Sequence, residues 1–149
     1  MAPVHPRLSA VIVTTPQAVA LLDAMKCLSF TRATSIPVLG LIENMSGYVC
    51  PCCGEISNVF STGGGAEMAK REDLTFLGSL PVDTELVTLL DAADVDNTPS
   101  TEELSGGGSQ KSFQLLEKYE KTSTAPLFKN AVDIIIRTLE LRHENIVIS

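Results

Sequence analysis

The chain has 149 residues, of which 44% are hydrophobic and 19% charged, as is typical of a globular domain with a buried core. Its formal net charge is −7, with 11 basic residues against 18 acidic ones, and it has no Trp. Proteins that bind nucleic acid need clustered Lys and Arg to displace counterions, and aromatic rings on which bases stack. The composition therefore argues against a nucleic-acid partner.

The N-terminal region carries no targeting or membrane signal that we can recognise. The first seven residues include two prolines and no apolar stretch long enough for a signal peptide. The apolar run at 8–13 is the length of a strand, whereas a membrane helix needs about 20 apolar residues. We therefore expect a cytoplasmic protein with no membrane partner.

Apolar runs rich in β-branched residues alternate with segments in which apolar residues recur at helical spacing. The runs predict strands buried in a parallel sheet, at residues 8–14, 38–42 and 74–80. The helical spacing predicts helices at residues 16–31, 66–71, 84–92, 113–119 and 126–141. This alternation indicates an α/β fold, with a partial parallel sheet and flanking helices.

The chain divides into four segments by composition. Residues 1–92 are expected to form the main α/β domain, with a long cysteine-bearing loop at 44–62. Residues 93–111 are acidic and rich in Gly and Ser, which predicts a flexible insertion. Residues 112–142 are expected to form helices that pack on the same domain, followed by a tail at 143–149. One apolar stripe is predicted to face the sheet, and it comprises Phe128, Ala131, Val132, Ile135 and Leu139.

Two runs of three glycines, at 63–65 and 106–108, could suggest a phosphate-binding loop. Neither run is followed by the Lys and hydroxyl residue that such a loop requires, and no GxxxxGK[ST] or GxGxxG motif occurs in the sequence. We therefore interpret the first run as the entry to a helix and the second as part of a linker.

The segment Cys50-Pro51-Cys52-Cys53-Gly54 is the most informative stretch of the sequence. A two-residue spacer lets the sulfurs of Cys50 and Cys53 point to one side of a tight turn. Proline stiffens this turn, and glycine permits the positive φ that directs backbone N–H groups at the thiolates. The spacing therefore predicts that Cys50 and Cys53 bind a metal.

One such turn supplies two ligands, whereas a tetrahedral zinc site or a cubane cluster needs four. A two-fold symmetric dimer, in which each subunit contributes Cys50 and Cys53, would complete the set. Thiolates suit both iron–sulfur and zinc, and a redox-active pair is a third reading, although that motif normally opens a helix. Of the remaining cysteines, Cys52 is expected to face solvent and Cys27 to be a small core residue.

Several motifs in the correct order resemble the Mrp/ApbC-type P-loop scaffold ATPases, and the eukaryotic cytosolic iron–sulfur cluster assembly factors in particular. The match is close over residues 8–90 and loose over 112–142. It is carried by VIVTTPQ at 11–17, GLIENMSG at 40–47, CPCC at 50–53, FSTGGGA at 60–66 and FLGSLPVD at 76–83.

The resemblance implies that the chain is the C-terminal part of a P-loop NTPase fold with a deviant Walker A loop, similar to MinD and Mrp. It implies a homodimer, or a heterodimer or heterotetramer with a paralogous scaffold ATPase. The subunits would share a bridging [4Fe–4S] cluster, held by Cys50 and Cys53, and pass it to apoproteins. The alternative function is a zinc-bridged dimerisation module without cluster transfer.

The resemblance also implies ATP and Mg²⁺ in the full-length family. Asn44 matches an asparagine associated with the nucleotide base, and Pro81, Val82 and Asp83 correspond to a loop that lines the base pocket. The family's Walker A loop and Mg²⁺ ligands precede the strand at which this chain starts. Because phosphoryl transfer depends on them, we expect no ATP hydrolysis by this chain alone.

Overall fold

The computed structural model describes residues 8–50, 52–57, 61–95 and 116–147. Strands and helices alternate over most of these ranges, as the sequence predicts. The elements are β1 (Ala10–Thr14), α1 (Ala18–Ala33), β2 (Val38–Val49), β3 (Ile56–Ser57), α2 (Gly64–Arg71), β4 (Phe76–Val82), α3 (Thr84–Val95) and α5 (Ala125–Val147).

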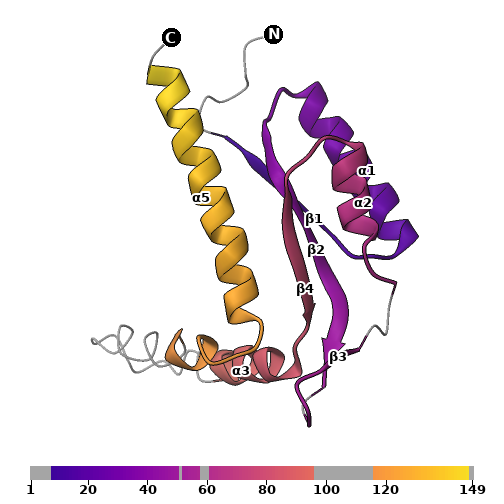
Figure 1. Cartoon of the computed structure of the whole chain (residues 1–149), viewed down its shortest axis with the longest axis vertical. Coiled ribbons are helices and arrows are strands. Elements are labelled where there is room, and N and C mark those ends of the chain that lie inside the picture. Colours follow the sequence, from indigo (N-terminus) through magenta and orange to yellow (C-terminus); the bar gives the residue numbers. More distant parts are fainter. Residues whose placement is uncertain (1–7, 51, 58–60, 96–115, 148–149) are drawn as a thin grey trace.

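The sheet is built around β2. It pairs in parallel with β1 on one side and with β4 on the other, and its last residues pair with the short antiparallel β3. Helices α1 and α2 cover one face of the sheet, and α5 lies along the other (Figure 1). The predicted α/β fold with a partial parallel sheet is therefore confirmed.

The core beneath α1 and α2 consists of apolar side chains from both helices and two strands. Ile12 of β1 and Leu41 of β2 pack against Leu28 of α1 and Met68 of α2, and the last three of these are at most 2% exposed. Burial of a side chain of this size contributes about 2 kcal/mol relative to full exposure. This cluster fixes α2, and with it the segment that follows the cysteines, against the sheet.

Helix α5 forms a second, smaller core on the opposite face. Ala131 is 2% exposed and packs with Ile42 and Leu77, while Ile134 and Ile135 lie against the same cluster. Because Ala131 is small, the helix can approach the strands closely at this point. The prediction that the C-terminal helix packs on the sheet is confirmed.

The apolar stripe predicted for α5 is only partly correct. Ala131 and Ile135 face the sheet, but Phe128, Val132 and Leu139 remain between 37% and 47% exposed. The apolar arc of this helix is wider than its contact with the sheet, so periodicity alone could not show which part of the arc is covered.

The strand β2 is longer than predicted and continues into the expected loop at 44–62. It bends at an irregularity between Asn44 and Tyr48, where its register with β4 shifts and Met45 adopts a φ of 58°. The Gly, Ser and Asn residues of this stretch suggested a loop, but they form the bulge and let the strand continue to Val49.

Several other boundaries also differ from the prediction. The strand predicted at 74–80 spans Phe76–Val82, and it accommodates Pro81 because β4 pairs with β2 alone among the described strands. Helix α3 continues to Val95, and α5 continues to Val147 through most of the expected tail at 143–149. The flexible insertion predicted at 93–111 lies outside the described residues from position 96 onward.

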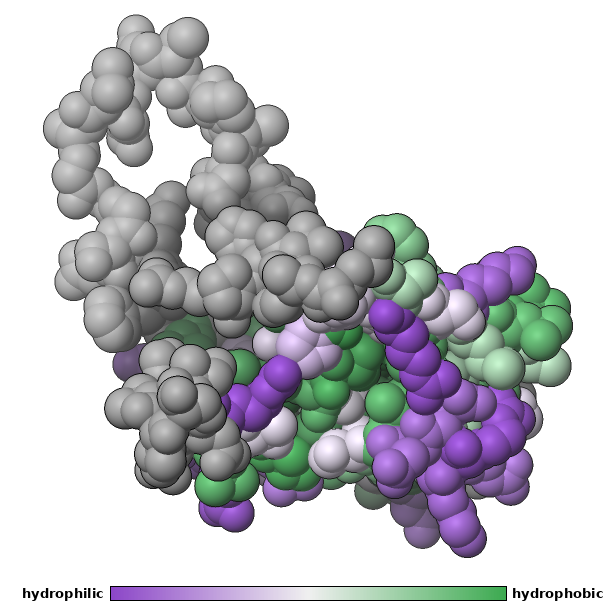
Figure 2. Space-filling view, turned by 90° about the horizontal axis from the view of Figure 1, so that it is seen from above, coloured by the Kyte–Doolittle hydropathy of each residue, from purple (hydrophilic) through white to green (hydrophobic). Residues whose placement is uncertain are grey.

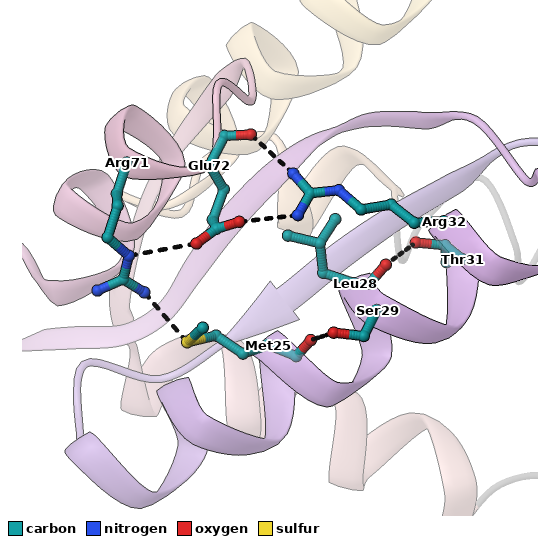
Figure 3. Close-up of polar contacts among 7 residues, drawn as sticks. All are labelled: Met25, Leu28, Ser29, Thr31, Arg32, Arg71 and Glu72. Atoms are coloured by element: carbon teal, nitrogen blue, oxygen red, sulfur yellow. Dashed lines mark hydrogen bonds and ion pairs between the residues drawn. The ribbon is translucent and has the colours of Figure 1, made fainter.

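Polar contacts join the C-terminal ends of α1 and α2 (Figure 3). Arg32 donates to the Glu72 carboxylate at 2.8 Å and to the Glu72 backbone oxygen at 3.0 Å, and Arg71 Nε donates to the same carboxylate at 3.2 Å. These bonds lower the pKa of Glu72, with the bond from Arg32 contributing most. Because the ion pairs lie at the surface, they orient the helix ends more than they stabilise the fold.

Some apolar side chains on β1 and α1 are not covered. Val13, Val19, Leu22 and Phe30 are between 58% and 73% exposed. Figure 2, which views the molecule from above relative to Figure 1, shows hydrophobic surface between hydrophilic residues. None of the helices in the described ranges has the length and apolarity needed to cross a membrane.

Candidate metal centre

The cysteines lie at the tip of a hairpin formed by β2 and β3. Val49 pairs with Ile56, and Cys50 follows directly. The Cys50 N–H donates to the Glu55 backbone oxygen at 2.9 Å, and the Gly54 N–H donates to the Cys50 oxygen at 2.8 Å. Gly54 has a φ of 72°, which glycine adopts without strain. The cysteines therefore lie in the turn of a hairpin, and not in the first turn of a described helix as a redox-active pair normally would.

Backbone N–H groups are directed at the first sulfur of this turn. The N–H of Cys52, and next that of Cys53, lowers the pKa of the Cys50 thiol below its ordinary value. Such hydrogen bonds stabilise a thiolate, which is the form that binds metals. Cys53 Sγ lies 4.0 Å from a carboxylate oxygen of Glu55. The turn thus makes the Cys50 thiol easier to deprotonate than an ordinary thiol.

Exposure distinguishes the four cysteines. Cys50 is half-buried, Cys52 and Cys53 are exposed, and all four cysteines are free thiols. The prediction that Cys52 faces solvent is confirmed. The prediction that Cys27 is a core residue is wrong, because Cys27 is exposed on α1, at the edge of the helix face that buries Ala24 and Leu28.

The turn on its own provides an incomplete coordination shell. Within the part of the chain that the structure describes, there is no place where three or more His, Cys, Asp or Glu side chains come together so that they could hold a metal ion. Zinc and cubane clusters need four ligands. The soft sulfurs of Cys50 and Cys53 fit an iron–sulfur cluster or zinc as half of a ligand set.

Sequence reasoning missed the residue at the base of this hairpin, Glu43. Its side chain is fully buried, and its carboxylate accepts hydrogen bonds from Ser46 Oγ at 2.6 Å and from the N–H groups of Gly63 and Gly65. A signal was present in the sequence: an acidic residue closes an otherwise apolar strand. Two of its three partners come from a distant glycine run, which no local pattern indicates.

The residues that the resemblance links to the nucleotide base are only partly brought together. Asn44 and Pro81 line one cavity of about 360 Å³, and Val82 and Asp83 do not line it. The other lining residues come from β4, α3 and the C-terminal region, and they are Leu80, Leu86, Leu90, Tyr119, Thr124 and Phe128. The assignment of these four residues to a nucleotide stays a prediction.

Asp83 lies between the N-termini of α3 and α5 and accepts hydrogen bonds at both. One carboxylate oxygen accepts from the N–H groups of Glu85 and Leu86 at the start of α3, and the other accepts from the Ser123 and Thr124 hydroxyls just before α5. Burial raises the pKa of Asp83, but these hydrogen bonds outweigh it and hold the pKa below its ordinary value. The carboxylate therefore ties together the two helices that line the cavity.

A family model described as "ParA: NUBPL iron-transfer P-loop NTPase" matches residues 1–114. The chain belongs to this family. The resemblance to Mrp/ApbC-type scaffolds inferred from the motifs is thereby confirmed. The cysteine hairpin and the Asn44 strand both fall within the matched range.

Curated relatives support the same assignment. The chain is 38% identical over 174 residues to "Cytosolic Fe-S cluster assembly factor CFD1" of Mycosarcoma maydis, covering 91% of this chain and 48% of that protein. It is 50% identical over 145 residues to the protein of the same name in Emericella nidulans, covering 91% of this chain and 43% of that protein. The chain thus spans a little under half the length of these relatives.

A solved structure also matches the fold. The nucleotide-binding protein of Archaeoglobus fulgidus, determined in complex with ADP, is 34% identical, with a TM-score of 0.50. The match covers 61% of this chain and 37% of that protein. The predicted relation to the P-loop NTPase fold is therefore confirmed.

Proposed function

We propose that this chain is the cluster-binding part of an iron–sulfur assembly scaffold, which holds a labile [4Fe–4S] cluster between two subunits and passes it to apoproteins. The observation that carries the proposal is the geometry of the Cys50–Cys53 turn. It places two sulfurs at an exposed tip, with N–H groups directed at the Cys50 sulfur and too few ligands nearby to close a site.

The position of the turn suits a cargo more than a permanent cofactor. A redox cofactor is usually enclosed, because burial and hydrogen bonds to sulfur tune its potential. Here Cys53 is exposed at the tip of a hairpin, so a recipient protein can reach a cluster bound there. The same exposure allows a second subunit to supply the missing pair of thiolates.

The printed names of the relatives supply the setting of the proposal. They are called cytosolic assembly factors, so we place the activity of this chain in the cytosol. The second subunit is either another copy of this chain or a paralogous scaffold ATPase, in a dimer or a heterotetramer. The recipients are apoproteins whose own cysteines accept the cluster.

The cavity lined by Asn44 and Pro81 supports a nucleotide function in the full-length family. Asn44 offers amide groups to the edge of a base, and Pro81 offers an apolar surface to its face. The chain contains no GxxxxGK[ST] loop to hold phosphates and Mg²⁺. We therefore propose that ATP dependence is a property of the full-length scaffold, and that this chain alone does not hydrolyse ATP.

Anaerobic reconstitution with iron and sulfide tests the proposal. The wild-type chain should acquire the broad visible absorption of a cubane cluster, with one cluster for two chains. A Cys50→Ala/Cys53→Ala variant should remain colourless, whereas a Cys27→Ala control should behave as wild type. Zinc without iron or sulfide in protein purified without oxygen, together with failed reconstitution, would instead support the zinc-bridged module.

A further inference from the structure

The buried carboxylate of Glu43 lies outside the candidate ligand set, yet its bonds connect the two limbs of the cysteine hairpin. It lies within β2, where the strand pairs in parallel with Thr14 of β1 and Ser79 of β4, and its side chain has 0% exposure. A buried carboxylate is costly unless hydrogen bonds replace its lost hydration. At Glu43 every hydrogen-bond donor comes from a residue within or beside the segment that carries the cysteines.

The donors lie on both sides of the cysteines in sequence. Ser46, on the incoming limb, donates from Oγ to Glu43 Oε1 at 2.6 Å. Gly63 and Gly65, on the outgoing limb, donate from their backbone N–H groups, Gly63 to Oε1 at 3.1 Å and Gly65 to Oε2. One side chain thereby closes the hairpin at its base, which we call the neck and define as Glu43, Ser46, Gly63 and Gly65.

The neck is packed as well as hydrogen-bonded. A Cβ atom added at Gly65 would lie 2.9 Å from Glu43 Oε2 and 3.0 Å from Glu43 Cβ, so the helix approaches the side chain as closely as glycine allows. The residue at the N-cap of α2 is Gly63, which has no side chain to cap the first turn. The Glu43 carboxylate meets the N–H groups there and interacts favourably with the helix dipole. The outgoing limb is tied a second time where Ser61 Oγ donates to the Pro16 oxygen at 3.1 Å.

The incoming limb needs this support because β2 bends within the neck. Met45 has a φ of 58°, and the register with β4 shifts between Asn44 and Tyr48. Left-handed backbone at a non-glycine residue costs free energy and persists only where its surroundings enforce it. The Ser46 hydroxyl bond to Glu43 fixes the chain immediately after this residue, and therefore fixes the direction in which β2 leaves toward Cys50.

We propose that Glu43 is a positioning residue for the cysteine turn: by joining both limbs at the neck it fixes the orientation of Cys50 and Cys53, and so sets how long a bridged cluster is retained. The inference rests on the proposed function. A cluster shared by two subunits is held only while both sulfurs of each subunit are in position to bind iron at the same time. A freely moving hairpin would therefore lose the cluster sooner.

The decisive variant is Glu43→Gln in the full chain. Glutamine keeps the size of the side chain but replaces one acceptor oxygen with an NH₂ group, which faces N–H donors at the neck. The matched control is Glu67→Gln, since Glu67 is an exposed acidic residue in the first turn of the same helix. Ser46→Ala is a milder second variant that removes one donor and leaves the carboxylate in place.

The first readout is the half-life of the reconstituted cluster against an iron chelator, at a temperature where circular dichroism shows every variant folded. Substitution of partners behind metal ligands typically weakens metal binding by about 10-fold or more. We expect Glu43→Gln to shorten the half-life by about 10-fold, Ser46→Ala by about 3-fold, and Glu67→Gln to match wild type. Wild-type half-lives in folded Glu43→Gln and Ser46→Ala would overturn the proposal.

The second readout needs no cluster, so it separates this proposal from the proposed function. Amide hydrogen exchange at Cys50 and Gly54, whose N–H groups are bonded within the hairpin, should accelerate in Glu43→Gln and not in Glu67→Gln. If the wild-type chain takes up no cluster, the proposed function fails, and exchange still decides whether Glu43 orders the hairpin. Unchanged exchange in folded Glu43→Gln and Ser46→Ala would show a role in stability alone and would overturn the positioning role.

Discussion

The tip and the neck of the cysteine hairpin are close in sequence but opposite in physical character. At the tip, Cys52 and Cys53 are exposed and the described hydrogen bonds are mostly between backbone groups of the turn. At the neck, Glu43 is fully buried and accepts three hydrogen bonds from protein groups. The comparison separates the proposed metal ligands from the buried group that holds the hairpin together, so substitutions at the two places should have different consequences.

The largest loss of stability is expected at the neck. Glu43→Ala leaves the N–H groups of Gly63 and Gly65 and the Ser46 hydroxyl without an acceptor, and it opens a cavity beside α2. We expect the free energy of unfolding to fall by about 3 kcal/mol, measured by urea denaturation. Glu67→Ala, on the exposed side of the same helix, should change it by no more than about 0.5 kcal/mol. Equal effects of the two substitutions would remove the distinction between neck and surface.

A slightly smaller loss is expected from Gly65→Ala, which tests packing at the neck without removing a polar group. The added methyl would lie 2.9 Å from a Glu43 oxygen and 3.2 Å from Leu41 Cδ2, so either the helix or the carboxylate must shift. Overpacking of this kind costs about 2 kcal/mol. Thermal unfolding of the variant beside wild type checks it, and an unchanged midpoint would mean that the neck is looser than described.

Asp83 is a second buried carboxylate that accepts hydrogen bonds at helix N-termini, and it is remote from the cysteines in sequence. Its contribution to stability can be tested through its dependence on pH. Its pKa lies below the ordinary value of 3.8, so its contribution to stability is present above that pH and is lost as the pH falls through the lower folded pKa. Asp83→Asn removes the charge and keeps the size. We expect it to cost about 1 kcal/mol at neutral pH, and to cost less in acid.

Urea denaturation of Asp83→Asn and wild type across the acidic range checks this prediction. The gap between the two proteins should narrow as the pH falls below 3.8. A gap that stays constant with pH would show that the charge of Asp83 contributes nothing and that the hydrogen bonds to α3 and α5 act without it.

The smallest effect on stability is expected at the tip. Cys50→Ala/Cys53→Ala removes two exposed or half-buried side chains and leaves the backbone bonds of the turn intact. Calorimetry of the metal-free protein should therefore show the same unfolding midpoint as wild type, while metal binding is abolished. A large drop in the midpoint would place the cysteines among the residues that hold the fold together.

The contrast between tip and neck also explains what the sequence could predict. The strands, the helices and the cysteine turn follow from local signals: β-branched runs, helical spacing, and the Cys-Pro-x-Cys-Gly pattern. These signals are complete within a few residues, so they can be recognised without the fold. Two of the hydrogen bonds to Glu43 come from a glycine run about 20 residues further on, and no local pattern contains that information.

The same reason accounts for the errors at α5 and at Cys27. The apolar arc of α5 is wider than its contact with the sheet, so periodicity could not show that Phe128 stays half exposed while Ala131 is buried. Cys27 is a small apolar residue of the kind found in cores, but it lies at the edge of the α1 face that buries Ala24 and Leu28 and remains exposed. Which face of a helix is buried depends on the element that packs against it, and the sequence of the helix alone does not show this.

The most direct test of the account is native mass spectrometry of the anaerobically reconstituted wild-type chain, with iron and sulfide counted in the same sample. We predict two chains joined by one [4Fe–4S] unit, and separation into single chains when the cluster is removed or when both Cys50 and Cys53 are replaced. A cluster carried by a single chain, or an iron-loaded dimer that persists in the double variant, would contradict the central claim.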